Sequence, residues 1–269
     1  MNGRFTSRSV VWSFVILSFT ASALAQSTQT AKPYEPQVGQ AGKDVVWVPT
    51  PQVLVDKMLD MAKVTPQDFV VDLGSGDGRT VISAAKRGAR AMGIEYNPDM
   101  VELSRKNAEA AGVSDKANFT KADLYETDFS KAQVVTMFLL PSINMKLRPK
   151  LLDMKPGTRI VTNSFTMEDW QADASETVTD DCSSWCTAHL WIVPAKVEGS
   201  WQLPQGTLAL KQQFQMLSGT LGSTTISEGR LRGEQIEFTV GSVKYTGRVD
   251  GRTIRGTTSD GQPWTATRG

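Results

Sequence analysis

The sequence contains one histidine and two cysteines, and these small numbers restrict the chemistry that it can carry out. The histidine, His189, lies in an apolar run over residues 187–193 that predicts a strand, so we expect it to be structural rather than a general base. A Ser-His-Asp set is therefore not indicated. Two cysteines alone do not make a zinc site, and the Cys-x-x-x-Cys spacing of Cys182 and Cys186 is not the Cys-x-x-Cys redox spacing. We expect no metal site.

The sequence also lacks an excess of charge of either sign. It has 29 Lys+Arg against 28 Asp+Glu, a formal net charge of +1, and its basic residues are scattered. A chain of this composition has no overall charge that would attract a phosphate backbone or an anionic lipid surface. We therefore expect no nucleic acid among its partners.

Long hydrophobic runs are missing as well, apart from one near the N-terminus. Residues 10–20 are mostly apolar but are interrupted by serines, and a membrane span needs roughly 20 apolar residues. Arg4 and Arg8 precede this run, and Ala23-Leu24-Ala25 follows it as an A-x-A cleavage site. We predict that residues 1–25 are a signal peptide cleaved after Ala25, with export to the periplasm and no membrane span afterwards; an uncleaved anchor is the alternative.

The next segment is polar and then gives way to the first predicted helix. Residues 26–44 are rich in Gln, Ser, Thr, Pro and Gly, which favours a disordered leader. Order is expected from Val45 onward. Thr50 and Pro51 are typical of an N-cap followed by proline at the first helical position. The apolar residues of the following segment have helical spacing, with one face toward a core.

A glycine-rich turn stands at the centre of the sequence pattern. Residues 69–73 predict a buried strand around Asp72, Gly74, Gly76 and Gly78 follow at once, and residues 80–87 have helical spacing. Strand, glycine turn and helix together allow a nucleotide-like ligand to approach the backbone. The dinucleotide fingerprint G-x-G-x-x-G/A fits poorly, because its third position is Arg79, too large for close helix–strand packing.

Further strands are predicted at residues 90–95, 117–122, 133–138 and 158–163, with a helix at 99–111. Their alternation with helices predicts an α/β fold with a doubly wound, mostly parallel sheet, and a ligand outside the carboxyl ends of the strands. Glu95 ends the second strand. An ionised carboxylate at this position suits the two hydroxyls of a ribose, because it only accepts hydrogen bonds.

The pattern Asp72-x-Gly74-x-Gly76-x-Gly78 resembles motif I of the class I S-adenosylmethionine-dependent methyltransferases. Together with the segments at residues 46–51, 93–98, 138–141 and 147–150, it is similar to a bacterial group of these enzymes. That group resembles the mitochondrial protein-lysine methyltransferases that modify the ATP synthase c subunit and the adenine nucleotide translocase. The resemblance covers about residues 45–195, which we expect to form a Rossmann-like methyltransferase domain.

The resemblance implies S-adenosylmethionine as cofactor and N-methylation of a protein lysine as the reaction. Asp72, Gly74 and Gly76 would hold the methionine portion, Glu95 the ribose, and Asp123 the adenine amino group. The alternatives are a non-catalytic envelope protein that uses the same pocket for binding, and a methyltransferase that acts on a small molecule. Export raises a difficulty, because the cofactor is made in the cytosol.

The acceptor side of the pocket is less well indicated. Residues 138–141, Phe-Leu-Leu-Pro, occupy the position where nucleic-acid adenine methyltransferases carry an acidic or amide residue, two prolines and an aromatic residue, so a flipped base is disfavoured. An apolar wall there suits the stem of a lysine, although these residues could simply end a buried strand. The substrate-pocket candidates are Trp47, Thr50, Phe138 and Pro141, and no catalytic residue is assigned.

With an export signal, a local disulfide between Cys182 and Cys186 is expected, provided that a turn brings them together. After residue 195 the helical spacing disappears. Residues 199–269 contain short alternating runs punctuated by glycines, which predict an antiparallel β domain, a small barrel or curved sheet that docks on the first domain.

Overall fold

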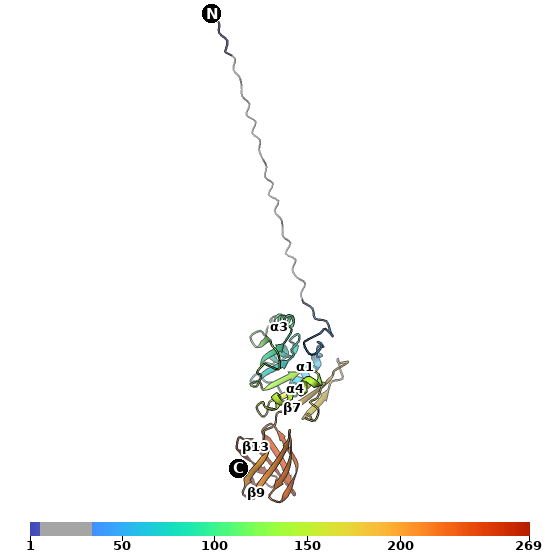
Figure 1. The fold of residues 1–269 in the computed structure, drawn as a ribbon, viewed down its shortest axis with the longest axis vertical. Coiled ribbons are helices and arrows are strands. Elements are labelled where there is room, and N and C mark those ends of the chain that lie inside the picture. The colour runs from blue at the N-terminus through green and yellow to red at the C-terminus, as the bar shows by residue number, and fades with distance from the viewer. Residues whose placement is uncertain (6–33) are drawn as a thin grey trace. The chain divides into compact units, whose positions relative to one another are not determined.

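The computed structural model describes residues 1–5 and 34–269 (Figure 1). The predicted signal peptide and the first part of the predicted leader fall mostly on residues 6–33, outside the described residues. Residues 1–5 form neither helix nor strand. Within the described ranges, no helix is both long enough and apolar enough to cross a membrane.

A seven-stranded sheet forms the first part of the folded chain, in the order β3-β2-β1-β4-β5-β7-β6. The strands β3, β2, β1, β4 and β5 run parallel, β7 is antiparallel to β5, and β6 is antiparallel to β7. The strand order reverses between β1 and β4, so the edge above these two strands is the topological switch point where open α/β sheets bind ligands. The bounds are β1 Phe69–Leu73, β2 Arg90–Glu95, β3 Ala117–Lys121, β4 Val134–Met137, β5 Arg159–Asn163, β6 Ala174–Thr177 and β7 Thr187–Ile192.

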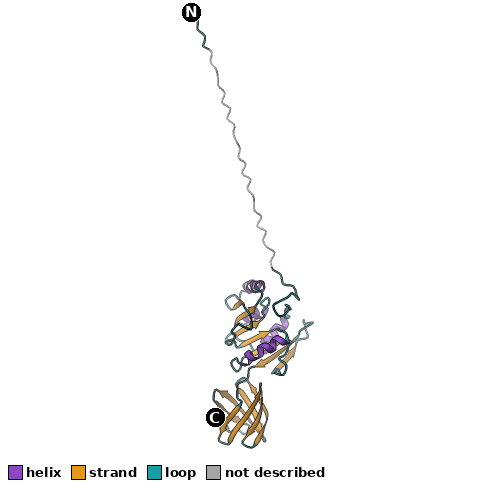
Figure 2. Cartoon of the chain, viewed as in Figure 1, coloured by secondary structure: helices purple, strands orange, loops and turns teal. Residues whose placement is uncertain are grey.

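Helices cover both faces of this sheet (Figure 2). Successive residues of β1 point to opposite faces, so Val70 joins one core with α1, α2 and α3, whereas Val71 and Leu73 join a second core with α4. The predicted doubly wound α/β architecture is therefore confirmed. The helices are α1 Gln52–Met61, α2 Arg79–Lys86, α3 Pro98–Ala110 and α4 Pro141–Leu152.

Two helix details differ from the sequence expectation. Helix α1 has Pro51 as its N-cap residue and no side-chain cap, so the predicted capping role of Thr50 is wrong. The Thr50 hydroxyl is instead committed to the neighbouring strand β5, because Asn163 Nδ2 donates to Thr50 Oγ1 at 3.2 Å. The sequence pattern does not indicate α4, because Pro141 and Pro149 break its apolar spacing.

Residues 34–44, the last part of the expected disordered leader, are folded. The backbone amide of Gly39 donates to Trp47 O at 2.8 Å, and that of Trp47 donates to Gln40 O at 2.9 Å. An isolated bridge joins Ala41 to Val46, and Gln40 Nε2 donates to the Tyr34 hydroxyl at 2.6 Å. Backbone and polar contacts order this segment, so its lack of large apolar residues does not mark it as disordered.

The second part of the chain is a closed eight-stranded antiparallel barrel in the order β10-β11-β12-β13-β14-β15-β8-β9. Its core is mainly aliphatic and contains an aromatic cluster, in which the rings of Phe238 and Tyr245 stack at 4.9 Å and Trp264 meets both edge-on. The predicted antiparallel β region at residues 199–269 is confirmed, and the chain reverses between its strands β9 and β10 at Phe214, which has φ 54°. The bounds are β8 Gly199–Leu203, β9 Gly206–Gln213, β10 Met216–Leu221, β11 Thr224–Arg232, β12 Gln235–Val240, β13 Val243–Asp250, β14 Thr253–Thr258 and β15 Pro263–Arg268.

The barrel contacts the sheet region through a small set of specific interactions. Arg230 Nη2 donates to Asp173 Oδ1 at 2.7 Å, and the Asp173 side chain is only 1% exposed. The ring of Phe214 stacks on Trp170 with centroids 5.9 Å apart, and Gln215 Nε2 donates to the Gln171 carbonyl at 2.7 Å. An ion pair, an aromatic stack and a hydrogen bond therefore hold the two regions together.

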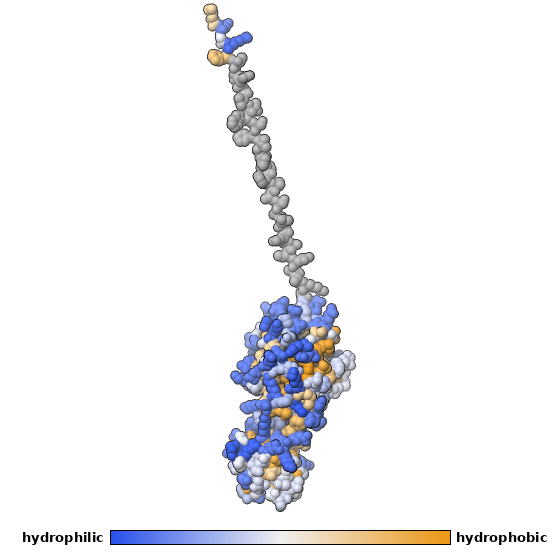
Figure 3. Space-filling model, in the orientation of Figure 1, coloured by the Kyte–Doolittle hydropathy of each residue, from blue (hydrophilic) through white to orange (hydrophobic). Residues whose placement is uncertain are grey.

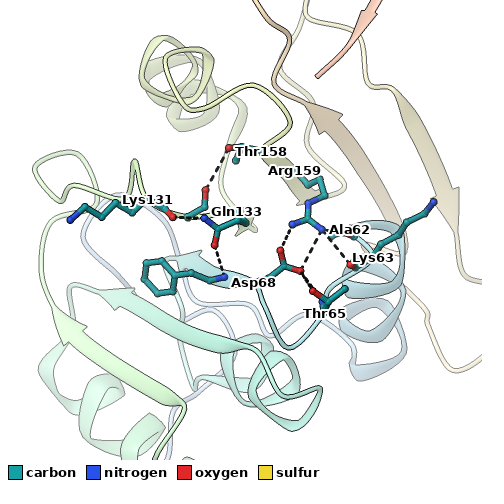
Figure 4. Close-up of polar contacts among 10 residues, drawn as sticks. Ala62, Lys63, Thr65, Asp68, Lys131, Gln133, Thr158 and Arg159 are labelled. Atoms are coloured by element: carbon teal, nitrogen blue, oxygen red, sulfur yellow. Dashed lines mark hydrogen bonds and ion pairs between the residues drawn. The ribbon is translucent and has the colours of Figure 1, made fainter. Parts of the chain in front are cut away.

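An ion pair stabilises the sheet at the amino ends of β1 and β5, opposite to the switch point (Figure 4). The buried Asp68 accepts hydrogen bonds from Thr65 N at 2.8 Å and Thr65 Oγ1 at 3.0 Å, and it pairs with the Arg159 guanidinium. Arg159 Nη1 also donates to Ala62 O at 2.8 Å, so it ties the end of α1 to β5. Burial by itself would raise the pKa of Asp68, but the Arg159 and Thr65 hydrogen bonds outweigh it and hold that pKa below its ordinary value.

Replacing Arg159 by alanine should destabilise the protein by about 3 kcal/mol at pH 7, because Asp68 would remain buried and charged without its partner. The matched control is Arg248→Ala, which breaks the more exposed pair with Glu234 and should cost less than about 1 kcal/mol. Urea unfolding measures both. Because the pKa of Asp68 is depressed, the contribution of the pair should vanish as the pH falls through that pKa. Equal losses in the two variants at pH 7 would contradict the account.

Candidate active site

A cavity of about 250 Å³ opens at the switch-point edge of the sheet. Its wall includes the segment 40–50, the glycine turn after β1, the residues that follow β2, β3 and β4, and the side chains of Phe165 and Trp185. The predicted position of a ligand outside the carboxyl ends of β1 and β2 therefore corresponds to a real cavity.

The glycine turn has a backbone conformation that side chains would not allow. Gly74, Gly76 and Gly78 have φ of +76°, +55° and +83°. A Cβ on Gly76 would lie 2.6 Å from Trp47 Nε1, and one on Gly78 would lie 2.8 Å from the Phe119 ring. The turn therefore exposes bare backbone to the cavity, as close approach of a ligand requires.

Hydrogen bonds from neighbouring elements hold the turn in place. The amides of Gly74 and Ser75 both donate to Ile94 O on β2, at 2.9 and 3.1 Å. Helix α3 holds two of its carbonyls: Ser104 Oγ donates to Gly76 O at 2.8 Å, and Asn107 Nδ2 donates to Asp77 O at 2.9 Å. The turn is thus anchored independently of any ligand.

Asp72 is buried beneath the turn. Burial, with smaller contributions from the charges of Glu95 and Asp77, raises the pKa of Asp72 to about 7, although Thr136 Oγ1 donates to Asp72 Oδ1 at 2.6 Å and opposes this shift. A carboxyl in this state is ready to ionise beside a cation. The structure brings this residue to the cavity, where the sequence pattern places it.

Glu95 joins the end of β2 to the glycine turn. Its Oε2 accepts a hydrogen bond from Gly76 N at 2.9 Å, and its Oε1 accepts one from Asn97 N at 2.9 Å. A carboxylate has about four lone-pair positions, so two remain for a ligand. The residue therefore faces the cavity with its orientation already fixed.

Asp123 lies across the cavity and is engaged by the folded segment 34–44. Asp123 Oδ1 accepts from Tyr125 N at 2.9 Å, and its other oxygen pairs with Lys43. The Lys43 hydrogen bond, aided by that of the Tyr125 amide, lowers the pKa of Asp123. Lys43 Nζ also lies 4.9 Å from the centroid of the Tyr96 ring. Sequence reasoning misses Lys43 and Tyr96, because the spacing of a polar leader gives no signal for a contact across 80 residues.

The structure places three of the four predicted substrate-pocket residues at the cavity. Trp47, Thr50 and Phe138 line the cavity. Thr50 is held there by two partners, since Asn163 donates to its hydroxyl and Arg79 Nη1 donates to its carbonyl at 2.8 Å. Pro141 is the first residue of α4, is exposed and does not line the cavity, although Leu140 before it does. Proline suits the first turn of a helix, and this explains its place there.

Three aromatic rings gather at one side of the cavity. The ring centroids of Phe138 and Phe165 are 5.9 Å apart, those of Phe138 and Trp185 5.9 Å, and those of Phe165 and Trp185 5.1 Å. We call these three residues the aromatic wall. Trp185 lies in a short loop closed by a disulfide between Cys182 and Cys186, whose Cα atoms are 5.9 Å apart. The sequence indicates neither Phe165 nor Trp185, because it gives no spacing signal for either.

His189 lies on β7 and is half-buried, with Nδ1 2.8 Å from Ser175 Oγ. Burial lowers its pKa, so the ring is neutral at pH 7. It is not part of the cavity wall. Within the described ranges, no group of three or more His, Cys, Asp and Glu side chains could hold a metal ion.

The arrangement suits a ligand with a cationic part and a nucleoside-like part. Asp72, Asp77 and Glu95 place carboxyl groups around the bare glycine backbone, while apolar side chains make up most of the remaining wall. Bare backbone at Gly74 and Gly76 lines the cavity next to the Glu95 carboxylate, and this combination fits an adenosyl group that carries a sulfonium. The residues present therefore match the cofactor that the sequence implies.

Comparison with known proteins agrees with this geometry. A family model described as the ANTKMT methyltransferase domain matches residues 72–174. This range contains the glycine turn, Glu95, Asp123 and Phe138, and it ends before the disulfide loop and the barrel.

Individual relatives align with this chain over longer stretches than the family model does. A protein-lysine N-methyltransferase of Saccharolobus islandicus (strain REY15A) is 45% identical over 129 residues, which are 47% of this chain and 80% of the relative. The lysine N-methyltransferase of the ATP synthase c subunit from Mus musculus is 33% identical over 171 residues, 62% of this chain and 68% of the relative. A crystal structure described as an RNA methyltransferase from Salinibacter ruber in complex with S-adenosyl-L-homocysteine is 46% identical, covers 56% of this chain and 96% of that chain, and has a TM-score of 0.53.

The long aligned portions of these relatives, the strand order and the preorganised cavity lead to one assignment. The protein is an enzyme that transfers a methyl group, and S-adenosylmethionine is its cofactor. The chain belongs to the family of S-adenosylmethionine-dependent methyltransferases represented by the ANTKMT methyltransferase domain.

Proposed function

We propose that this methyltransferase modifies the side-chain nitrogen of a lysine in a protein substrate. The observation that carries the proposal is one continuous cavity that joins the glycine turn to the aromatic wall. The names of the Saccharolobus and mouse relatives, both lysine N-methyltransferases, support the same acceptor. A lysine has a long apolar stem and a single nucleophilic nitrogen, which suits an apolar entrance above a charged cofactor site.

The cofactor residues divide into three groups under this proposal. Asp72 and the backbone of Gly74 and Gly76 bind the methionine portion, Glu95 takes the ribose hydroxyls, and Asp123 takes the adenine amino group. The existing hydrogen bonds of Glu95 to Gly76 N and Asn97 N support its role, because they aim the carboxylate before the ligand arrives. For Asp123, Lys43 now occupies one oxygen, so that contact has to be shared or exchanged when adenine binds.

The chain has little bond-making chemistry to perform. The bound cofactor supplies an activated methyl group on a sulfonium. The protein residues must align the lysine nitrogen with that methyl group and exclude water, which can be worth ~7–11 kcal/mol of the barrier. The lysine first loses a proton to solvent, and the apolar side chains around the entrance lower the pKa of its ammonium and so favour that loss.

A protein partner is also supported by the surface around the cavity. Figure 3 shows apolar surface gathered on the region that contains the sheet. Val46, Tyr96, Leu140 and Trp185 line the cavity and are between 38% and 51% exposed. Exposed apolar rims of this kind mark sites of protein interaction.

RNA is the second candidate substrate, because the Salinibacter structure is described as an RNA methyltransferase. The charge of this chain argues against it, since a formal net charge of +1 provides little attraction for a phosphate backbone. The apolar Phe138-Leu139-Leu140 segment at the acceptor side also differs from the polar residues needed to hold a flipped base.

For the location of the protein we propose export to the periplasm after cleavage behind Ala25. The sequence of residues 1–25 supports this, as does the Cys182–Cys186 disulfide, since such bonds persist in oxidising compartments. An exported methyltransferase requires a supply of cofactor outside the cytosol.

Cell fractionation followed by N-terminal sequencing tests the location. We expect the native protein in the periplasmic fraction, starting at Gln26, because the A-x-A site precedes that residue. An Ala25→Arg variant should remain uncleaved, since only small residues are accepted there. Native protein in the cytosol that begins at Met1 would rule out export.

The pKa of Asp72 predicts how cofactor binding depends on pH. Its carboxyl is largely protonated below pH 7 in the free protein, and binding a cation favours the ionised form. The affinity for S-adenosylmethionine should therefore rise between pH 5 and pH 7, by at most about tenfold per pH unit, and level off above. Calorimetry at several pH values measures this.

The Asp72→Asn variant should bind more weakly at pH 8 and lose the rise between pH 5 and pH 7. Glu102→Gln, on the exposed face of α3, is the matched control and should follow the parent protein. A pH profile unchanged by Asp72→Asn would show that this carboxyl does not control binding.

The acceptor class can be tested by incubating the purified protein with cell-envelope extract and cofactor labelled on its methyl group. We expect label in protein that resists ribonuclease, is released by protease and is recovered as methyl-lysine after hydrolysis. Glu95→Gln should reduce labelling by at least about tenfold, because one acceptor of the ribose hydroxyls becomes a neutral amide. Label lost with ribonuclease would favour RNA, and label only in small molecules would favour a small-molecule acceptor.

A further inference from the structure

The aromatic wall stands where the acceptor must approach. In the β1–β4 register Leu73 pairs with Met137, so Phe138 follows beside Gly74 at the start of the glycine turn. Strand β5 continues the same edge, and Phe165 lies just beyond its last residue, Asn163. The rings of Phe138 and Phe165 therefore lie beside the glycine turn, on the side away from Glu95 and β2.

The antiparallel strand β7 brings the third ring to this edge. Because β7 runs against β5, the loop before β7 lies at the carboxyl ends of the parallel strands, and Ser164 N donates to Thr187 O at 2.7 Å. That loop contains the Cys182–Cys186 disulfide and carries Trp185. The hydrogen bonds between β5 and β7 therefore fix the C-terminal end of this loop beside the cavity.

Trp185 does not have the environment of a core residue. It is 45% exposed and has φ +58°, a conformation that costs a residue with a Cβ about 1–2 kcal/mol. Its ring contacts Phe138 and Phe165, which are themselves only partly buried. The disulfide-closed loop therefore holds a large aromatic ring over the cavity rather than in the hydrophobic interior.

Aromatic faces attract weakly hydrated cations, and methylated ammonium groups are the best suited of these. Transfer to a lysine necessarily creates such a group beside the glycine turn. Phenylalanine rings supply no hydrogen-bond acceptor, and the indole N–H only donates, so the wall favours an ammonium that has lost N–H groups to methylation.

We propose that Phe138, Phe165 and Trp185 bind the methylated ammonium group of the acceptor lysine, and that the Cys182–Cys186 bond holds Trp185 in place for this role. The site rests on the proposed lysine acceptor and adds the residues that contact it. Trp185 lies outside the range matched by the family model, residues 72–174.

The test is a binding titration on the full chain saturated with S-adenosyl-L-homocysteine. The probe is Nα-acetyl-Nε-trimethyl-lysine amide, and its neutral counterpart carries a tert-butyl group in place of the trimethylammonium. Calorimetry should show the cation binding at least about fivefold more tightly than the neutral probe, because the two have the same shape and differ in charge. Equal affinities would overturn the proposal.

Variants of the loop separate the ring from the rest of the fold. Trp185→Ala should weaken binding of the cationic probe by at least about fivefold, whereas Trp185→Phe should retain most of it. The double variant Cys182→Ser/Cys186→Ser should behave like Trp185→Ala, because the loop is no longer closed. Met216→Ala, an exposed apolar residue on β10 of the barrel, is the control and should change nothing.

Each variant is also titrated with S-adenosyl-L-homocysteine alone, which should bind as in the parent protein and shows that the pocket is folded. Normal binding of this ligand, with the trimethyl-lysine probe unaffected by Trp185→Ala, would overturn the aromatic site and leave the methyltransferase intact. If the parent protein binds the homocysteine but transfers methyl groups only to RNA, the proposed lysine acceptor fails, and the aromatic site fails with it.

Discussion

The hydrogen bond from the Gly76 amide to the Glu95 carboxylate is the contact on which the site depends. It links the tips of β1 and β2, and it fixes an acid against bare backbone before any ligand is present. The bond is possible because three glycines take up positive φ and because α3 holds the carbonyls of the turn. A rigid cradle of this kind reduces the ordering cost that ligand binding would otherwise carry.

Sheet topology explains why the acceptor side assembles next to this cradle. The parallel strands deliver Asp72, Glu95, Asp123 and Phe138 to one edge, since all of them lie at or just beyond carboxyl ends. Strand β7 runs the other way, so it delivers the loop before it, with Trp185 and its disulfide, to the same edge. The opposite edge is occupied by the Asp68–Arg159 pair, which stabilises the sheet without entering the cavity. The residues that line the cavity and the ion pair that stabilises the sheet therefore lie at opposite ends of the strands.

The sequence predicts which residues meet around the glycine turn, because this part of the cavity is built from neighbours in the chain. Asp72, the glycines and Glu95 lie within 24 residues, and their strand–turn–helix pattern is strong. Phe165, Trp185 and Lys43 enter the same cavity through strand pairing and long-range contacts, for which spacing gives no signal. The differences from the sequence expectation have physical causes too. Thr50 bonds to Asn163 instead of capping, and backbone contacts order residues 34–44 despite their polar composition. Pro141 begins α4 and does not line the cavity.

The central claim is that the cradle formed by Gly76 and Glu95 receives an adenosyl group, and a crystal structure of the protein with S-adenosyl-L-homocysteine tests it most directly. The account predicts both ribose hydroxyls within hydrogen-bonding distance of Glu95, the adenine next to Asp123, and the sulfur facing the aromatic wall. A ligand bound elsewhere, or a Glu95 carboxylate turned away from the ribose, would contradict it.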